Sequence, residues 1–315
     1  MKVVVARTLP DAGLTRLTER FAVEVGGLPF DRDRLLERVR GAAAIVADPT
    51  VPIGDAELDA AGDALRVVAN FAAGVDNIDL EAVRRRGVRA TNTPDVLTNA
   101  TAELAVALML AAGRRLAETD RVVRAGEWTG WEPEQFLGRE LSGATVGLVG
   151  FGRIGRRVAE LLRGFEARIV FAARGPHAEA AARLGARRLA LDELLAVSDY
   201  VSLHVALTAA THHLVDARAL ARCKPGAVLV NTCRGAVVDT AALVRALRDG
   251  PLAAAGLDVY EDEPSVPAEL AALPNTVLAP HVGSATRRTR DAMASLCADN
   301  VIAVLGGREP PAAVV

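Results

Sequence analysis

The sequence predicts an α/β protein built from two Rossmann-like parallel-sheet domains. Short aliphatic runs alternate with amphipathic segments along the whole chain, which is typical of repeated βα units. The composition is 51% hydrophobic but only 3% aromatic, and small aliphatic side chains suit the packing of helices on a sheet. The length of 315 residues is enough for two domains, each with its own core.

The first hundred residues predict five strands with helices between them. The expected strands are Val3–Ala6, Ala22–Val25, Ala43–Ala47, Arg66–Ala69 and a short Val88–Ala90. The expected helices lie near Asp11–Arg20, Asp31–Arg40, Asp55–Ala61 and Leu80–Arg86. This alternation indicates one complete parallel-sheet domain.

A long helix is expected over Thr98–Arg124. Its first half is apolar on nearly every face, so we expect it to be buried between domains or against a second subunit. The following segment, Gly126–Arg139, contains both tryptophans and has no clear period, which predicts a loop.

A second series of strands begins at residue 145. The expected strands are Thr145–Val149, Arg168–Ala172, a weak Arg187–Leu189, Tyr200–Leu203, Ala227–Asn231, Ala253–Leu257 and Thr276–Leu278. A last helix over Ser284–Leu305 is placed to return to the first domain. We therefore expect one domain from residues 1–98 and 284–315 and an inserted domain from residues 99–283, with a shared cleft.

Charge and cysteine usage exclude several classes of protein. The formal charge is −2 with acids and bases interspersed, which argues against a nucleic-acid or membrane-surface binder. The longest apolar run, Leu104–Ala112, is too short to span a bilayer, and the N-terminus lacks a signal-peptide pattern. Three cysteines without paired spacing fit a reducing compartment, so a cytoplasmic location is expected. No local motif indicates a metal site.

A glycine-rich turn follows the strand at residues 145–149. Gly150, Gly152 and Gly155, with Arg153 and Ile154 between them, form a GxGxxG pattern that runs directly into a helical segment. The first glycine allows the tight turn, the second lets backbone approach a pyrophosphate, and the third permits close packing of helix and strand. The helix N-terminus adds amide donors for the phosphates. This context favours a dinucleotide site over a purely structural turn.

The position that reads the ribose carries no acid. Ala173 stands where a carboxylate would normally accept hydrogen bonds from the 2′-hydroxyl, and Arg174 follows it. Without the carboxylate, a 2′-phosphate is not repelled, and Arg174 can pair with it. We therefore favour NADP(H) over NAD(H), the alternative being a solvated Arg174 and an enzyme that uses either cofactor.

Three polar groups follow strands of the same domain. Arg234 suits bidentate capture of a carboxylate, and His281 is a candidate proton donor near neutral pH. An acidic run, Glu261–Glu263, supplies a carboxylate to orient the imidazole. Because the carboxyl ends of parallel strands share one edge, we expect Arg234, the acid and His281 to meet in one pocket opposite the bound dinucleotide.

With these residues in place, the chain resembles the D-isomer-specific 2-hydroxyacid dehydrogenases, and among them the glyoxylate/hydroxypyruvate reductase branch. The stretches that carry the resemblance run almost end to end in family order. They are AAGVDNIDL, TPDVLTNATAELAV, GEWTGWEP, VGFGRIGRRVA, NTCRGAVVD, AAAGLDVYEDEP and PHVGSATRRTR.

The resemblance implies a role for individual positions. Arg234 matches the arginine that binds the substrate carboxylate and carbonyl, His281 the general acid/base, and Glu263 its acidic partner. Ala73 and Gly74 match the loop whose amides hold the substrate carboxylate. The implied reaction is NAD(P)H-dependent reduction of a small 2-oxo acid to the D-2-hydroxy acid, in a flavodoxin-like substrate domain with an inserted dinucleotide-binding domain.

Further cofactor contacts and a homodimer follow from the same resemblance. Thr101 matches a residue near the cofactor, and Asp258 one near the nicotinamide carboxamide. The remaining implied cofactor contacts are His204, Val205, Thr232, Cys233 and Gly283. Family members are typically homodimers built on the helix near Thr98–Arg124, and Trp131 is our candidate for a residue that reaches the partner's substrate, the alternative being plain interface packing.

Two positions depart from the family's sequence pattern, and two alternative functions remain open. Ala206 replaces a common proline in LHVALT, and Cys233 replaces a more usual Ala or Ser. Phosphite dehydrogenases share the three central residues but resemble a pattern with lysine where this chain has Ala73. A cofactor-sensing, corepressor-like binding protein is the alternative outside enzymes.

Overall fold

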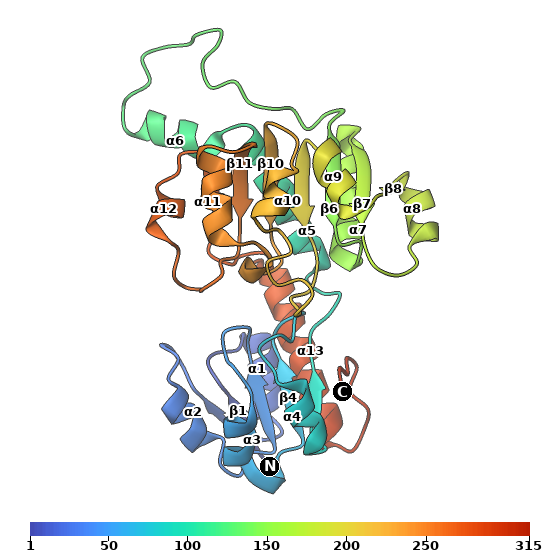
Figure 1. Ribbon diagram of the computed structural model, residues 1–315. Helices are drawn as coiled ribbons and strands as arrows, with labels where there is room; N and C mark the ends of the chain where they lie inside the picture. The colour runs from blue at the N-terminus through green and yellow to red at the C-terminus, as the bar shows by residue number, and fades with distance from the viewer. The chain divides into compact units, whose positions relative to one another are not determined.

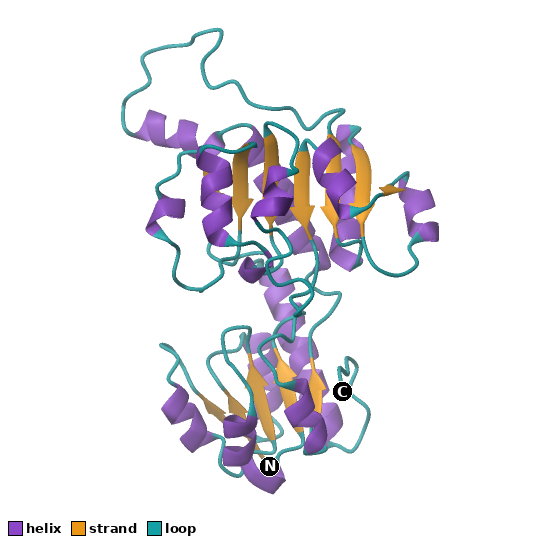
Figure 2. Ribbon diagram, viewed as in Figure 1, coloured by secondary structure: helices purple, strands orange, loops and turns teal.

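The structure, a computed structural model, describes all residues 1–315 and divides into two compact units. Unit 1 comprises Met1–Leu97 and Ser284–Val315, and unit 2 comprises Thr98–Gly283. Each unit is an α/β layer structure with its own parallel sheet (Figures 1 and 2). The predicted fold class is therefore confirmed.

Unit 1 carries five parallel strands in the order β2-β1-β3-β4-β5, the flavodoxin-like arrangement. The strands are β1 (Lys2–Val5), β2 (Ala22–Val25), β3 (Ala44–Ala47), β4 (Val67–Asn70) and β5 (Arg89–Thr91). The helices are α1 (Asp11–Thr18), α2 (Arg32–Arg38), α3 (Asp55–Ala61), η1 (Gly62–Ala64), α4 (Leu80–Arg85) and α13 (Arg287–Leu305).

Helices cover both faces of this sheet. Alternate strand residues such as Val4, Ile45 and Val68 pack with α2, α3 and α4. On the other face α13 packs on α1, where a side chain at Gly13 would lie 2.4 Å from the carbonyl oxygen of Ala294. The sequence can bring these two helices so close only because position 13 is glycine.

Unit 2 carries seven parallel strands in the order β12-β11-β10-β9-β6-β7-β8, the order of dinucleotide-binding domains extended by one strand. The strands are β6 (Thr145–Val149), β7 (Arg168–Ala172), β8 (Arg187–Arg188), β9 (Tyr200–Leu203), β10 (Ala227–Asn231), β11 (Leu252–Leu257) and β12 (Thr276–Leu278). The helices are α5 (Thr98–Gly113), α6 (Leu116–Arg124), α7 (Arg153–Leu162), η2 (Arg163–Phe165), α8 (Ala178–Leu184), α9 (Leu191–Val197), α10 (Ala217–Ala221), η3 (Gly235–Val237), α11 (Thr240–Arg248) and α12 (Ala268–Ala271).

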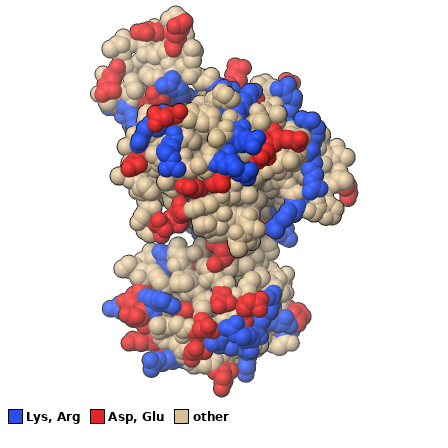
Figure 3. All heavy atoms as spheres, in the orientation of Figure 1, with Lys and Arg blue, Asp and Glu red and all other residues tan.

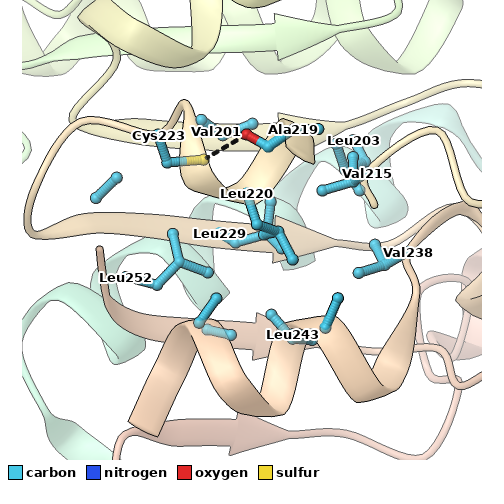
Figure 4. Packing of buried hydrophobic residues seen from close by; sticks show 14 of the residues in the cluster. Val201, Leu203, Val215, Ala219, Leu220, Cys223, Leu229, Val238, Leu243 and Leu252 are labelled. Carbon is cyan, nitrogen blue, oxygen red and sulfur yellow. Dashed lines mark hydrogen bonds between the residues drawn. The ribbon is translucent and has the colours of Figure 1, made fainter. Parts of the chain in front are cut away.

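Two apolar layers enclose the sheet of unit 2. On one face the strands pack against α9, α10 and α11, where Val201, Leu229 and Leu243 belong to one buried cluster (Figure 4). The Cys223 thiol of this cluster donates to the carbonyl of Ala219 at 3.8 Å. On the other face α5 and α7 pack on each other and on the strands.

The long helix predicted over Thr98–Arg124 is wrong in two respects. It is interrupted after Gly113, because Arg115 adopts a left-handed φ of 56° before α6 starts. The guanidinium of Arg115 donates two hydrogen bonds of 2.8 Å to Glu118, which hold this break. The apolar first half, α5, is buried against the sheet of its own unit rather than requiring another domain or subunit.

Charged side chains of both signs are mixed over the face shown in Figure 3, with no large area of one sign. No helix has both the length and the apolar character needed to cross a membrane.

Candidate active site

The glycine-rich turn lies where the order of strands reverses in unit 2. Gly150 donates its N–H to the carbonyl of Ala172 at 2.8 Å, and His204 donates its N–H to the carbonyl of Val149 at 2.7 Å. The turn is thus held between the ends of β7 and β9, on either side of β6. Ligands of open α/β sheets bind at such a switch point.

Glycine occupies each of the three positions of this turn for a different structural reason. Gly150 has φ of 100°, and a side chain there would lie 2.4 Å from the carbonyl oxygen of His204. A side chain at Gly155 would lie 2.4 Å from the carbonyl oxygen of Gly150. Gly152, the N-cap of α7, faces open space instead, with no heavy atom within 4 Å of a built side chain. Phosphate groups can therefore approach the backbone at Gly152.

Two buried polar atoms at the same edge of the sheet have no protein partner. They are Nε2 of His204 and Oγ1 of Thr232, at the ends of β9 and β10. Burial lowers the pKa of His204 to about 4, so this imidazole is neutral at physiological pH. Buried polar groups normally find a partner, so these two atoms and the open space at Gly152 fit a bound dinucleotide.

The segment after β7, which the sequence predicts to contact the ribose, is built around aromatic and cationic side chains. Phe151 and Phe171 stack at 4.0 Å, and the ring of His177 meets both edge-on. Arg174 is exposed at the strand end, as a residue that meets a solvent-facing ligand group must be. Arg188 of β8 donates to the carbonyls of Ala173 and Gly175, at 2.5 and 3.2 Å. Sequence analysis missed Arg188 because it lies on a separate strand.

Glu263 and His281 form a direct pair. The Nδ1 atom of His281 donates to Oε2 of Glu263 at 2.7 Å, and the other carboxylate oxygen accepts the N–H of Tyr260 at 3.0 Å. Burial would raise the pKa of Glu263, but the hydrogen bond and charge of His281, with the N–H of Tyr260 and the charge of Arg234, hold it below its ordinary value. The carboxylate is therefore ionised and leaves Nε2 of His281 for another partner.

The backbone of His281 is in a strained conformation that Asp258 stabilises. His281 has φ of 54°, a value uncommon outside glycine. The buried carboxylate of Asp258 accepts the N–H of Val282 at 2.7 Å and of Gly283 at 2.8 Å, and the carbonyl of Asp258 accepts the N–H of His281 at 2.9 Å. Burial raises the pKa of Asp258 despite these two donors. Asp258 thus fixes the loop that presents the imidazole.

Asn231 holds the turn that carries Arg234. Its side-chain oxygen accepts from the N–H of Cys233 at 3.0 Å, and its amide donates to the carbonyl of Arg234 at 2.8 Å. A side chain at Gly235 would lie 1.8 Å from the carbonyl carbon of Tyr260, so this glycine lets the Arg234 loop touch the loop of Glu263. The thiol of Cys233 is kept protonated, because burial raises its pKa to about 11.

The other candidate residues lie in separate places. Thr101 is buried in α5 and donates to the carbonyl of Gly283 at 3.2 Å, which links it to the His281 loop. In unit 1, the carbonyls of Ala73 and Gly74 accept the side-chain amides of Asn92 and Asn70, at 2.7 and 2.8 Å. These bonds fix the loop by its oxygens and leave its amides for a ligand.

Trp131 is not brought to the Glu263–His281 pair. It is 79% exposed on the loop between α6 and β6. In Figure 2 the strand arrows of unit 2 point away from this loop, so the loop lies at the amino edge of the sheet. A cavity of about 550 Å³ at the same edge, next to Leu137 and the start of β10, is likewise remote from Arg234.

Comparison with known proteins agrees with this geometry. Residues 106–283 match the profile of the D-isomer specific 2-hydroxyacid dehydrogenase NAD binding domain. A glyoxylate reductase of Thermococcus onnurineus is 49% identical, over 99% of this chain and 95% of that protein.

Solved structures show the same likeness over the entire chain. A Thermus thermophilus protein is 49% identical with a TM-score of 0.94 and covers 100% of both chains. The NADPH-dependent glyoxylate/hydroxypyruvate reductase of Sinorhizobium meliloti, in complex with NADP and malonate, is 35% identical with a TM-score of 0.87, over 100% of this chain and 96% of that one. The chain therefore belongs to the D-isomer specific 2-hydroxyacid dehydrogenase family of nicotinamide-dependent oxidoreductases, in its glyoxylate reductase branch.

Proposed function

We propose that this protein reduces a small 2-oxo acid, such as glyoxylate or hydroxypyruvate, to the D-2-hydroxy acid with NADPH as its preferred reductant. The observation that carries the proposal is the 2.7 Å bond between His281 and Glu263 in the unit that holds the dinucleotide turn. The names of the similar glyoxylate reductases support the choice of substrate class.

The residues divide the chemistry in a simple way. A bound nicotinamide supplies the hydride to the carbonyl carbon. His281, protonated and held by the ionised Glu263, gives its Nε2 proton to the carbonyl oxygen as that oxygen gains charge. Arg234 binds the carboxylate and the carbonyl of the substrate through its guanidinium, and the amides of Ala73 and Gly74 bind the carboxylate. One hydride and one proton are consumed for each hydroxy acid formed.

Three features support NADPH over NADH. Ala173 offers no carboxylate to bind a 2′-hydroxyl or repel a 2′-phosphate, and Arg174 is exposed beside it. Arg188 adds a second guanidinium to the same strand end through its bonds to Ala173 and Gly175. Two guanidinium groups without a carboxylate favour the ligand with the additional phosphate.

We also propose a homodimer, a cytoplasmic location and a division of labour between domains. Exposed apolar side chains cluster on α6 and the loop after it, namely Leu116, Val123, Trp128, Trp131 and Leu137. Such a patch supports contact with a second copy, through which Trp131 can reach the partner's substrate.

Three unpaired cysteines support a reducing compartment. Residues 1–98 with 284–315 would bind substrate, and residues 99–283 the cofactor.

The direct test is steady-state turnover of glyoxylate, hydroxypyruvate, pyruvate and phosphite with both nucleotides. We expect the highest kcat/KM for glyoxylate or hydroxypyruvate with NADPH. His281→Ala should lower kcat by about 10²- to 10⁴-fold while NADPH still binds. Turnover of phosphite alone, or no turnover of any 2-oxo acid by a protein that binds NADPH, would show that the proposal is wrong. Sedimentation of the intact chain tests the dimer.

A further inference from the structure

Unit 2 contains a second cluster of ionisable side chains that the proposed reaction does not use. His212 and His213 lie on the loop between β9 and α10, and Glu261 lies on the loop after β11. The Nε2 atom of His213 lies 2.6 Å from Oε1 of Glu261. One nitrogen from each histidine and one oxygen of Glu261 all lie within 4.8 Å of one another.

The backbone explains why two neighbouring histidines face the same way. Successive side chains point to opposite sides in an extended segment. His213 instead has a left-handed φ of 48°, and the two imidazole rings stack at 4.1 Å with 29° between their planes. Stacked rings with a carboxylate beside them form one cluster of donor atoms.

Both loops are anchored to the same short helix, η3. The N–H of His213 donates to the carbonyl of Ala236 at 2.8 Å. The Tyr260–Glu261 backbone lies against Gly235, where a built side chain would come within 2.2 Å of the Glu261 nitrogen. The second oxygen of Glu261 accepts the N–H of Thr240 at 3.4 Å. The positions of the ligand-bearing residues are therefore set before any ion arrives.

We propose that His212, His213 and Glu261 form a binding site for a divalent transition ion such as Zn²⁺. Two imidazole nitrogens and one carboxylate oxygen are ligands that Zn²⁺ prefers, whereas Mg²⁺ and Ca²⁺ require mostly oxygen. Bonds of about 2.0–2.1 Å in a tetrahedral site bring donor atoms to roughly 3.3 Å from each other. Rotation of the exposed His212 side chain, with a small increase in the 2.6 Å separation between His213 and Glu261, gives this spacing, and water is the fourth ligand.

The ion would tie together two loops that carry proposed active-site residues. Glu261 lies two residues before Glu263, and the His212–His213 loop begins at His204 beside the dinucleotide turn. An ion that binds Glu261 together with both histidines restrains the segment that positions Glu263. We therefore expect a bound ion to slow turnover. Binding of the ion does not depend on the proposed reaction, whereas the inhibition rests on it.

The test is calorimetric titration of the chelator-treated full chain with Zn²⁺, and absorption of Co²⁺ as a report on tetrahedral coordination. We expect one ion per chain, and a loss of affinity of at least about tenfold in His212→Ala, His213→Asn and Glu261→Gln. Asparagine tolerates the left-handed backbone at position 213, so that variant retains the loop. Thermal unfolding of each variant verifies its fold.

The other histidines provide the controls. His281→Ala removes the other histidine–carboxylate salt bridge, and His177→Ala removes a histidine that contacts two aromatic rings and a backbone carbonyl. Both should bind Zn²⁺ like the parent chain. Loss of the ion in His281→Ala instead, or unchanged binding in His212→Ala and His213→Asn, would overturn the site.

Inhibition is measured as turnover against free Zn²⁺, each variant relative to its own rate without metal. The parent should lose activity over the same concentration range in which it binds the ion, and His212→Ala should be insensitive there. Stoichiometric binding of Zn²⁺ without inhibition would refute the effect on turnover but would still support the binding site. Full turnover by a chain that binds no Zn²⁺ would refute the binding site but would still support the proposed function.

Discussion

The most informative single change is Glu263→Gln, which removes one charge and keeps the number of heavy atoms. In the native chain the two carboxylate oxygens accept separate hydrogen bonds, from Nδ1 of His281 at 2.7 Å and from the N–H of Tyr260 at 3.0 Å. Glutamine has a single acceptor oxygen, so it can serve only one of these donors. The other donor then faces an NH₂ group, and the protonated form of His281 loses its counter-charge.

The expected size of the effect follows from the lost interaction. A hydrogen bond to a charged group is worth about 1.5–3 kcal/mol, which corresponds to a fall in kcat of roughly 10- to 150-fold. The assay is NADPH oxidation with glyoxylate at saturation, together with NADPH affinity from fluorescence. Because Glu263 would act through the histidine, affinity for NADPH should not change. Asp262→Asn, which alters the exposed neighbouring acid, is the matched control and should retain the parent kcat. A Glu263→Gln enzyme with parent kcat would refute the role of the pair.

Three further predictions address cofactor choice, the histidine loop and acid stability. Arg174→Gln and Arg188→Gln should each lower kcat/KM for NADPH by about 10- to 150-fold and leave NADH nearly unaffected, and equal losses for both nucleotides would contradict the assignment. Asp258→Asn leaves a loop amide without its acceptor, so it should cost about 1–3 kcal/mol in the free energy of unfolding and lower kcat; parent stability would contradict the role of Asp258. Burial raises the pKa of Asp199, but Lys224 and the N–H of Thr145 more than offset it, so the pKa is lowered. The stability that this ion pair contributes is present above the ordinary pKa of 3.8 and is lost as the pH falls below it, and urea unfolding of Asp199→Asn should show a flatter acid dependence.

Local patterns in the sequence predicted the elements that are fixed locally. The strands from Thr145–Val149 to Thr276–Leu278 were predictable because buried parallel strands are short runs of aliphatic residues between polar turns. The glycine turn was predictable because the GxGxxG spacing stands directly between an aliphatic run and a helical segment. The common edge of a parallel sheet predicted that an acid of the run Glu261–Glu263 lies near His281, and the family resemblance singled out Glu263. These two side chains do meet in the structure.

The features that sequence reasoning missed depend on backbone conformations and side-chain contacts that no sequence pattern reveals. The break after Gly113 needs the left-handed Arg115, and only the bond to Glu118 reveals why it is stable there. Arg188 reaches the Ala173–Gly175 turn from the neighbouring strand β8, 13 to 15 positions further along the chain, so no local motif includes it. His212 and Glu261 are 49 positions apart in sequence, so no local metal-binding motif can include both.

The loop of His281 shows how the fold stores conformational strain where the chemistry requires position. A left-handed backbone at a residue other than glycine costs of order 1–3 kcal/mol and persists only if its surroundings determine it. Here the buried carboxylate of Asp258 fixes this conformation, because its two oxygens accept hydrogen bonds from the two amides that follow His281. The burial that raises the pKa of Asp258 also excludes water from competing for those amides. Two residues thus orient the imidazole of His281. Glu263 binds the ring itself, and Asp258 holds the backbone that carries it. Loss of either partner should lower the rate, but only loss of Asp258 should also lower the stability of the loop, and this difference separates the two roles by experiment.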